Sequence, residues 1–123
     1  VASHSAARHL CEGDHFSRLE GYRLIKDLHQ QLGQLPEALI TTSYILMEGV
    51  LDYLLELEID MSQLAMATFG DDRLLDFLPF GINSLPQQHD ALASQALELA
   101  LKAINGEYLC GLHYVSRTLK RRR

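Results

Sequence analysis

The sequence predicts an α/β fold in which short apolar strands alternate with longer helices. The first observation is residues 64–69, a nearly all-apolar run that ends in Gly70 and the carboxylates Asp71 and Asp72. Such a run is typical of a strand buried on both faces of a parallel sheet. The second observation is the alternation itself, because strand and helix patterns in turn indicate parallel βαβ units with right-handed crossovers.

The first half of the chain predicts two helices and a strand. A helix is expected over residues 18–32, because Ser17-Arg18-Leu19-Glu20 has the form of a capping box and Gly33 follows the last turn. Residues 38–42 are the next strand, after which Ser43 caps a helix of about 13 residues with apolar positions at helical spacing. Residues 8–11 could be the tail of an earlier strand.

The second half predicts a short strand over residues 82–85 and a helix over residues 90–104 that ends at Asn105-Gly106. Residues 109–119 are expected to form a final extended segment. These elements make about half of a usual domain of this class. With no methionine at its start, the sequence is expected to be a piece of a longer protein.

Composition narrows the class of protein. The net charge is −5, and five of the eleven basic residues lie in the last seven positions, so the acidic body disfavours wrapping a phosphate backbone. The basic tail over residues 120–123 is expected to be a solvated terminus. No apolar run is long enough to cross a bilayer, and Cys11 and Cys110 are expected to be reduced cytoplasmic thiols, although a disulfide is possible.

Motifs for catalysis are missing from the sequence. It has no G-x-S-x-G elbow, no glycine-rich phosphate loop, and no histidine or cysteine spacing that would hold a metal ion. We therefore expect no enzyme activity, no metal and no cofactor.

Four motifs occur in a fixed order along the chain. They are Pro36-Glu37-Ala38-Leu39-Ile40-Thr41-Thr42-Ser43, Gly49 in the next helix, Ala67-Thr68-Phe69-Gly70-Asp71-Asp72, and Ile82-Asn83-Ser84-Leu85-Pro86-Gln87. Together they resemble the C-terminal third of the lactose-repressor family, and residues 39–51 and 65–78 are most similar to its fructose-repressor branch. One departure is Gly81-Ile82-Asn83-Ser84, where the family usually has Pro-Leu-Thr-Thr.

The resemblance implies a periplasmic-binding-protein-like (type I) fold, in which residues 1–123 are the C-terminal portion of a domain for effector binding and dimerisation. It implies a cytoplasmic, sugar-responsive transcriptional regulator that forms a homodimer or homotetramer. Its effector would be a sugar phosphate, fructose 1-phosphate or fructose 1,6-bisphosphate, and operator DNA would be bound by an N-terminal helix-turn-helix absent from this sequence. The alternative is a periplasmic sugar-binding protein of a transport system, which shares the fold.

The candidate ligand residues follow the strands. Asp71 matches a family carboxylate that accepts hydrogen bonds from sugar hydroxyls, for which a carboxylate has several lone pairs. The alternative is that Asp71 or Asp72 caps the next helical turn, and we expect that role for Asp72. The resemblance also places Ser43, Tyr44 and Gln87 at the effector, although Ser43 has a second reading as a helix cap.

The apolar turn over residues 74–80 is the candidate dimer surface, because an apolar patch on a surface turn usually marks association. The alternative is ordinary core packing. The resemblance extends the patch to an exposed face of the preceding helix, and such an interface pairs each patch with its own copy. The predicted interface residues are Met47, Glu48, Leu51, Leu74, Leu75, Phe77 and Leu78.

Overall fold

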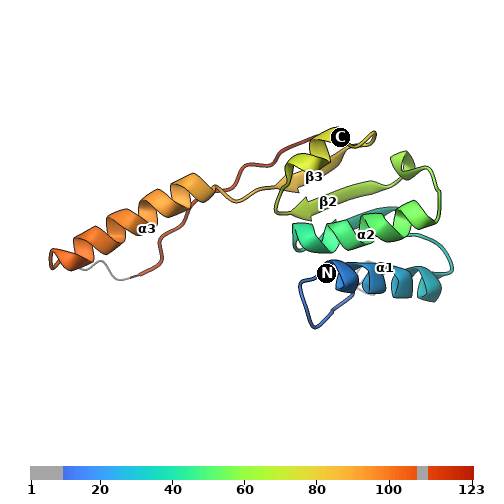
Figure 1. Ribbon diagram of the computed structural model, residues 1–123, viewed down its shortest axis with the longest axis horizontal. Coiled ribbons are helices and arrows are strands. Elements are labelled where there is room, and N and C mark those ends of the chain that lie inside the picture. Colours follow the sequence, from blue (N-terminus) through green and yellow to red (C-terminus); the bar gives the residue numbers. More distant parts are fainter. Residues whose placement is uncertain (1–9, 108–110) are drawn as a thin grey trace, which may run out of the picture.

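The computed structural model describes residues 10–107 and 111–123, and Figure 1 shows a small α/β body from which one helix extends. Its sheet has three parallel strands in the order β1-β2-β3. The helices and strands are α1 (Arg18–Leu32), β1 (Ala38–Thr41), α2 (Tyr44–Glu56), β2 (Ala65–Phe69), β3 (Ile82–Leu85) and α3 (His89–Ile104). Two 3-10 turns, η2 (Met61–Gln63) and η3 (Arg73–Phe77), precede β2 and β3.

Local capping chemistry sets the helix ends where the sequence predicts them. The Ser17 side chain accepts a hydrogen bond from the Glu20 N–H at 3.1 Å, which satisfies a backbone donor that the first turn leaves unpaired. Gly33 closes α1 with a φ of 73° and donates to the carbonyl of His29. The predicted limits of α1 are therefore confirmed.

One face of the sheet carries the core. Leu39, Met66 and Ile82 are cross-strand partners on this face, and the last two are buried. The expected burial of β2 on both faces is wrong for the described chain. Ile40 and Phe69 alternate onto the opposite face and are exposed, because among the described residues no helix covers that side.

Helix α2 lies between α1 and the sheet (Figure 1), so it is apolar around most of its circumference. Gly21 and Gly49 allow the close approach of the two helices, since a Cβ at either position would overlap the backbone of the other helix. Met47 and Leu51 consequently face the core, with Met47 0 % exposed. The prediction that both lie on an exposed face of this helix is wrong.

Helix α3 lies outside the packed α/β body. None of its residues is buried, and α3 points away from the sheet (Figure 1). The chain then returns, and Lys120 forms an antiparallel bridge to Ser84 on β3. Residues 111–119 form no strand, and Leu10 and Cys11 form none either.

Two expectations fall partly outside the described residues, namely the beginning of the 109–119 segment and a pairing of Cys11 with Cys110. Within the described part of the chain, every helix is too short or too polar to cross a lipid bilayer.

Candidate functional site

The carboxyl ends of the three strands meet at one edge of the sheet, which is where open α/β sheets bind ligands. Gly70 continues β2 with a φ of 87°, a conformation that favours glycine. Its N–H donates to the Leu85 carbonyl at 3.1 Å, which joins the ends of β2 and β3. A Cβ at Gly70 would lie 3.3 Å from the Tyr44 Cβ, so the start of α2 packs against the same point.

A row of buried hydroxyls crosses the sheet just before this edge. Register aligns Thr41 with Thr68, and Thr68 with Ser84. The Thr41 hydroxyl donates to Thr68 Oγ1 at 2.7 Å, and Ser84 donates to Asp71 Oδ1 at 2.8 Å. The row therefore brings polar groups from all three strands to one face and ends at Asp71.

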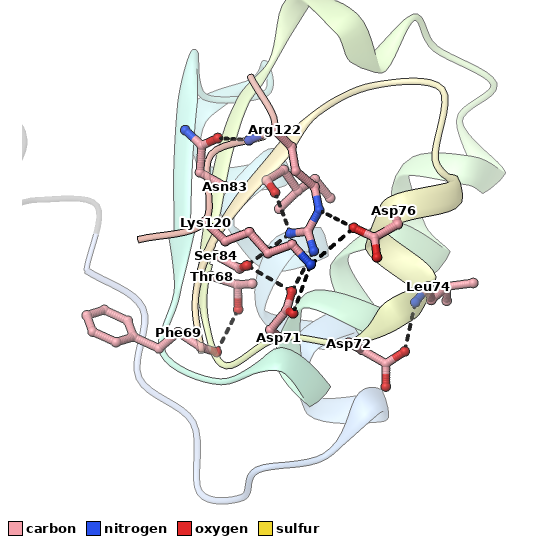
Figure 2. Close-up of polar contacts among 11 residues, drawn as sticks. Thr68, Phe69, Asp71, Asp72, Leu74, Asp76, Asn83, Ser84, Lys120 and Arg122 are labelled. Atoms are coloured by element: carbon pink, nitrogen blue, oxygen red, sulfur yellow. Dashed lines mark hydrogen bonds and ion pairs between the residues drawn. The ribbon is translucent and has the colours of Figure 1, made fainter. Parts of the chain in front are cut away.

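Asp71 lies in an ion-pair cluster that the returning C-terminal segment completes (Figure 2). Arg122 Nη2 donates to Asp71 Oδ1 at 2.7 Å, and Arg122 Nε donates to Asp76 Oδ1 at 3.0 Å. Lys120 Nζ lies 3.4 Å from Asp76 Oδ1 and 3.7 Å from Asp71 Oδ2. The members of this Asp71–Arg122 cluster are Asp71, Asp76, Ser84, Lys120 and Arg122.

The cluster holds Asp71 in its ionised form. Partial burial alone would raise the pKa of the Asp71 carboxyl, but hydrogen bonds from Arg122 and Ser84, with the positive charges of Arg122 and Lys120, outweigh it. The pKa of Asp71 consequently lies below its ordinary value. Asp76 has a lowered pKa as well, chiefly because Arg122 donates to it.

The expectation that the basic tail is a solvated terminus is wrong for Arg122. The Arg122 side chain is only 10 % exposed, and Lys120 pairs with the same two carboxylates as Arg122. The sequence contained one signal for this pairing, namely basic residues at the end of the chain opposite an acidic body. Periodicity and capping rules are local, so they could not select Asp71 as the partner of Arg122.

The other predicted ligand residues lie around the same edge with different roles. Ser43 accepts a hydrogen bond from the Leu46 N–H at 3.4 Å, so its second reading as the cap of α2 is confirmed. The Tyr44 hydroxyl is covered, and burial with the nearby Glu48 carboxylate raises its pKa. Gln87 is exposed just beyond the end of β3, and Asp72 caps η3 by accepting from the Leu74 N–H at 2.9 Å.

The chain is similar to regulators of sugar operons. It is 48 % identical over 108 residues to the fructose operon regulatory protein of Vibrio cholerae, a match that covers 88 % of this chain and 33 % of that protein. It is 40 % identical over 91 residues to the catabolite repressor/activator of Escherichia coli, covering 72 % of this chain and 27 % of that protein. No protein-family model matches the chain.

Solved structures show the same similarity to transcriptional regulators. The Cra transcriptional dual regulator of Pseudomonas putida, crystallised with fructose 1-phosphate, is 51 % identical with a TM-score of 0.85, and the match covers 90 % of this chain and 42 % of that one. The chain belongs to the lactose-repressor (LacI) family. A dimeric lac repressor structure at 15 % identity and a TM-score of 0.73 shows the same periplasmic-binding-protein-like fold, as predicted.

The relatives of this LacI-family chain are longer than it is. The chain spans about a third of the length of the Vibrio cholerae relative and about two fifths of the Pseudomonas putida structure. These relatives are named as transcriptional regulators.

The residues predicted for dimerisation in this LacI-family chain differ in their exposure to solvent. Leu75 is buried in the core together with Met47 and Leu51, so these three side chains cannot form an exposed patch. Phe77 is 71 % exposed and Leu74 is also exposed. Glu48 and Leu78 are half-buried, and Leu78 packs against the core.

Gly81 makes room for the C-terminal segment of this LacI-family chain. A Cβ at Gly81 would overlap the backbone carbonyl of Arg122. Gly81→Ala is therefore expected to displace this segment and to lower the free energy of unfolding by about 1–3 kcal/mol, the usual cost of overpacking. Thermal unfolding and limited proteolysis of the C-terminus measure both effects. A C-terminus as resistant to protease as in the wild type would contradict the prediction.

Proposed function

We propose that this chain is the effector-sensing and dimerisation part of a sugar-responsive transcriptional regulator with a sugar-phosphate effector. The observation that carries the proposal is the 51 % identity to a regulator crystallised with fructose 1-phosphate. The ionised Asp71 carboxylate at the carboxyl edge of the sheet supports it, because sugar hydroxyls are hydrogen-bond donors that a carboxylate accepts well. We propose fructose 1-phosphate or fructose 1,6-bisphosphate as the effector.

In this proposal Asp71 accepts sugar hydroxyls, while Ser43, Tyr44 and Gln87 line the same edge. The backbone and ring of Tyr44 would contribute, since its hydroxyl is covered. The phosphate is bound by a second subdomain that residues 1–123 do not supply. Helix α3 supports this division, because its apolar stripe of Leu97, Leu101 and Ile104 is exposed away from the body.

Regulation would follow from a shift between open and closed arrangements of the two subdomains. An effector that contacts both subdomains binds the closed form more tightly, so it increases the population of that form. The shift is transmitted to DNA-binding domains of a homodimer or homotetramer, which contact operator DNA in the cytoplasm. Similarity to named operon regulators favours this account over a periplasmic transport protein.

Calorimetry on the full-length regulator tests the proposed effector. We expect fructose 1-phosphate or fructose 1,6-bisphosphate to bind, and unphosphorylated fructose to bind at least about 100-fold more weakly, because charge-assisted hydrogen bonds to phosphate contribute several kcal/mol together. Tighter binding of the unphosphorylated sugar would instead support the transport protein.

Phe77→Asp tests the proposed dimer surface. Charge repulsion and desolvation of two carboxylates in a self-complementary patch are expected to dissociate the dimer. Phe77 is 71 % exposed, so the substitution leaves the core of the protomer intact. Sedimentation velocity of the full-length regulator would show the monomer, whereas Phe77→Leu, which keeps an apolar side chain, stays dimeric. An unaltered Phe77→Asp dimer would refute this surface.

A further inference from the structure

Arg122 donates hydrogen bonds to several separate parts of the fold. Its guanidinium donates to Asp71 and Asp76, and also to the Ser84 hydroxyl at 2.9 Å and to the Ile82 carbonyl at 3.1 Å. Its backbone N–H donates to Asn83 Oδ1 at 2.9 Å. The planar fork is therefore fixed in position by groups from β3, from η3 and from the end of β2 (Figure 2).

The two carboxylate oxygens of Asp71 differ in the hydrogen bonds that they accept. Oδ1 accepts from both Arg122 and Ser84. Among the described residues, Oδ2 faces Lys120 Nζ at 3.7 Å, which exceeds hydrogen-bond distance. Oδ2 thus keeps lone pairs for another donor, and the two bonds to Oδ1 fix the plane in which those lone pairs lie.

We propose that Arg122 is a positioning residue for the effector site, which holds the Asp71 carboxylate ionised and turned so that Oδ2 accepts a sugar hydroxyl. This inference rests on the proposed function. Arg122 itself makes no contact with the sugar in this account. The C-terminal segment, which follows the connection from α3, thereby helps to build a site that β2 alone would leave mobile.

Among the residues that the structure describes, the charged groups that face Asp71 all belong to this arrangement. Arg122 and Lys120 come from the C-terminal segment, and Asp76 from η3 shares both cations. Removing the Arg122 charge leaves burial and Asp76 to oppose ionisation, with Lys120 as the remaining cation. The Asp71 carboxyl would then bind a proton at a higher pH than in the wild type. A protonated carboxyl is a poorer acceptor for the sugar hydroxyl.

The test is the affinity of the full-length regulator for fructose 1-phosphate, measured by calorimetry from pH 8 to about pH 5. Arg122→Gln is expected to weaken binding about tenfold at neutral pH, and the ratio of wild-type to variant affinity should grow as the pH falls. The phosphate of the ligand also titrates in this range, but it does so equally for both proteins and cancels in the ratio.

Three control variants separate positioning from anchoring. Arg121→Gln removes the same charge from an exposed neighbour and should leave the affinity ratio flat. Asn83→Ala removes the acceptor of the Arg122 and Arg123 N–H groups, so it should lower thermal stability with little change in pH dependence. Arg122→Lys keeps the charge, so it should restore the wild-type pH dependence even where its affinity is reduced.

The outcomes distinguish the two proposals. If wild-type regulator does not bind fructose 1-phosphate or fructose 1,6-bisphosphate, the proposed function and this inference both fail. If Asp71→Ala weakens binding while Arg122→Gln shows the flat ratio of Arg121→Gln, only the role of Arg122 is overturned. If Arg122→Gln does not fold, Arg122→Lys provides the test. A pH midpoint for binding that is higher in Arg122→Lys than in the wild type would also overturn the role of Arg122.

Discussion

Replacing Asp71 by alanine is expected to lower the affinity of the full-length regulator for fructose 1-phosphate by about 10- to 100-fold. Hydrogen bonds to a charged group contribute about 1.5–3 kcal/mol, and every 1.4 kcal/mol corresponds to about tenfold in affinity. Arg122, Ser84 and Lys120 lower the pKa of this carboxyl, so it is ionised at neutral pH and able to accept a hydrogen bond from a sugar hydroxyl. Calorimetric titration of both proteins measures the loss.

Asp72→Ala is the matched control for this substitution, because the two carboxylates are neighbours with separate contacts. Asp72 caps η3 through the Leu74 N–H and faces away from the cluster (Figure 2). Its removal is expected to cost about 1 kcal/mol of stability and to leave sugar affinity unchanged. An Asp71→Ala variant that binds the sugar as tightly as Asp72→Ala would contradict the assignment.

Replacing Met47 by alanine is expected to lower the free energy of unfolding by about 2–5 kcal/mol, the range for large-to-small substitutions in a core. Met47 is 0 % exposed and lies in the same cluster as Leu54 and Ile82. Its side chain cannot reach a second protomer, so the loss should not depend on dimerisation. Denaturant unfolding at several protein concentrations measures both quantities.

Leu55→Ala is the control on the same helix, since Leu55 is exposed while Met47 is buried. Away from any interface, it should change stability by less than about 0.5 kcal/mol. A destabilisation by Met47→Ala that disappears at high protein concentration would instead place Met47 in the dimer interface.

Local sequence chemistry predicted much of the fold. Ser17, Gly33 and Ser43 set helix ends through hydrogen bonds to groups within four residues, so a reader of the sequence can place them. The end of β2 before Gly70-Asp71 could also be predicted from the sequence, because an apolar run stops there. These features need no knowledge of distant contacts.

The orientation of α2 could not be predicted in the same way. A helix packed between another helix and a sheet is apolar on more than one side, so periodicity alone does not tell which residues face solvent. The family resemblance placed Met47 and Leu51 outward, and periodicity did not contradict it, but the structure places both in the core. Gly49 lies on the face of α2 that contacts α1, whereas Leu55 lies on the face exposed to solvent.

The candidate site was predicted only in part. Asp71 was predicted from its place after β2 and from the family resemblance, but its partners Arg122 and Lys120 lie about fifty residues away along the chain. The return of the chain from α3 brings them together, and the one-residue bridge between Lys120 and Ser84 fixes the register. No local pattern encodes that return, which is why the tail was expected to be solvated.

The most direct test of the central claim is operator binding by the full-length regulator, followed by fluorescence anisotropy as fructose 1-phosphate is added. We predict that the sugar phosphate changes operator affinity by about 5- to 150-fold, the usual range of allosteric coupling, and that Asp71→Ala needs at least about tenfold more sugar for the same change. An operator affinity that stays constant up to saturating fructose 1-phosphate and fructose 1,6-bisphosphate would contradict the account.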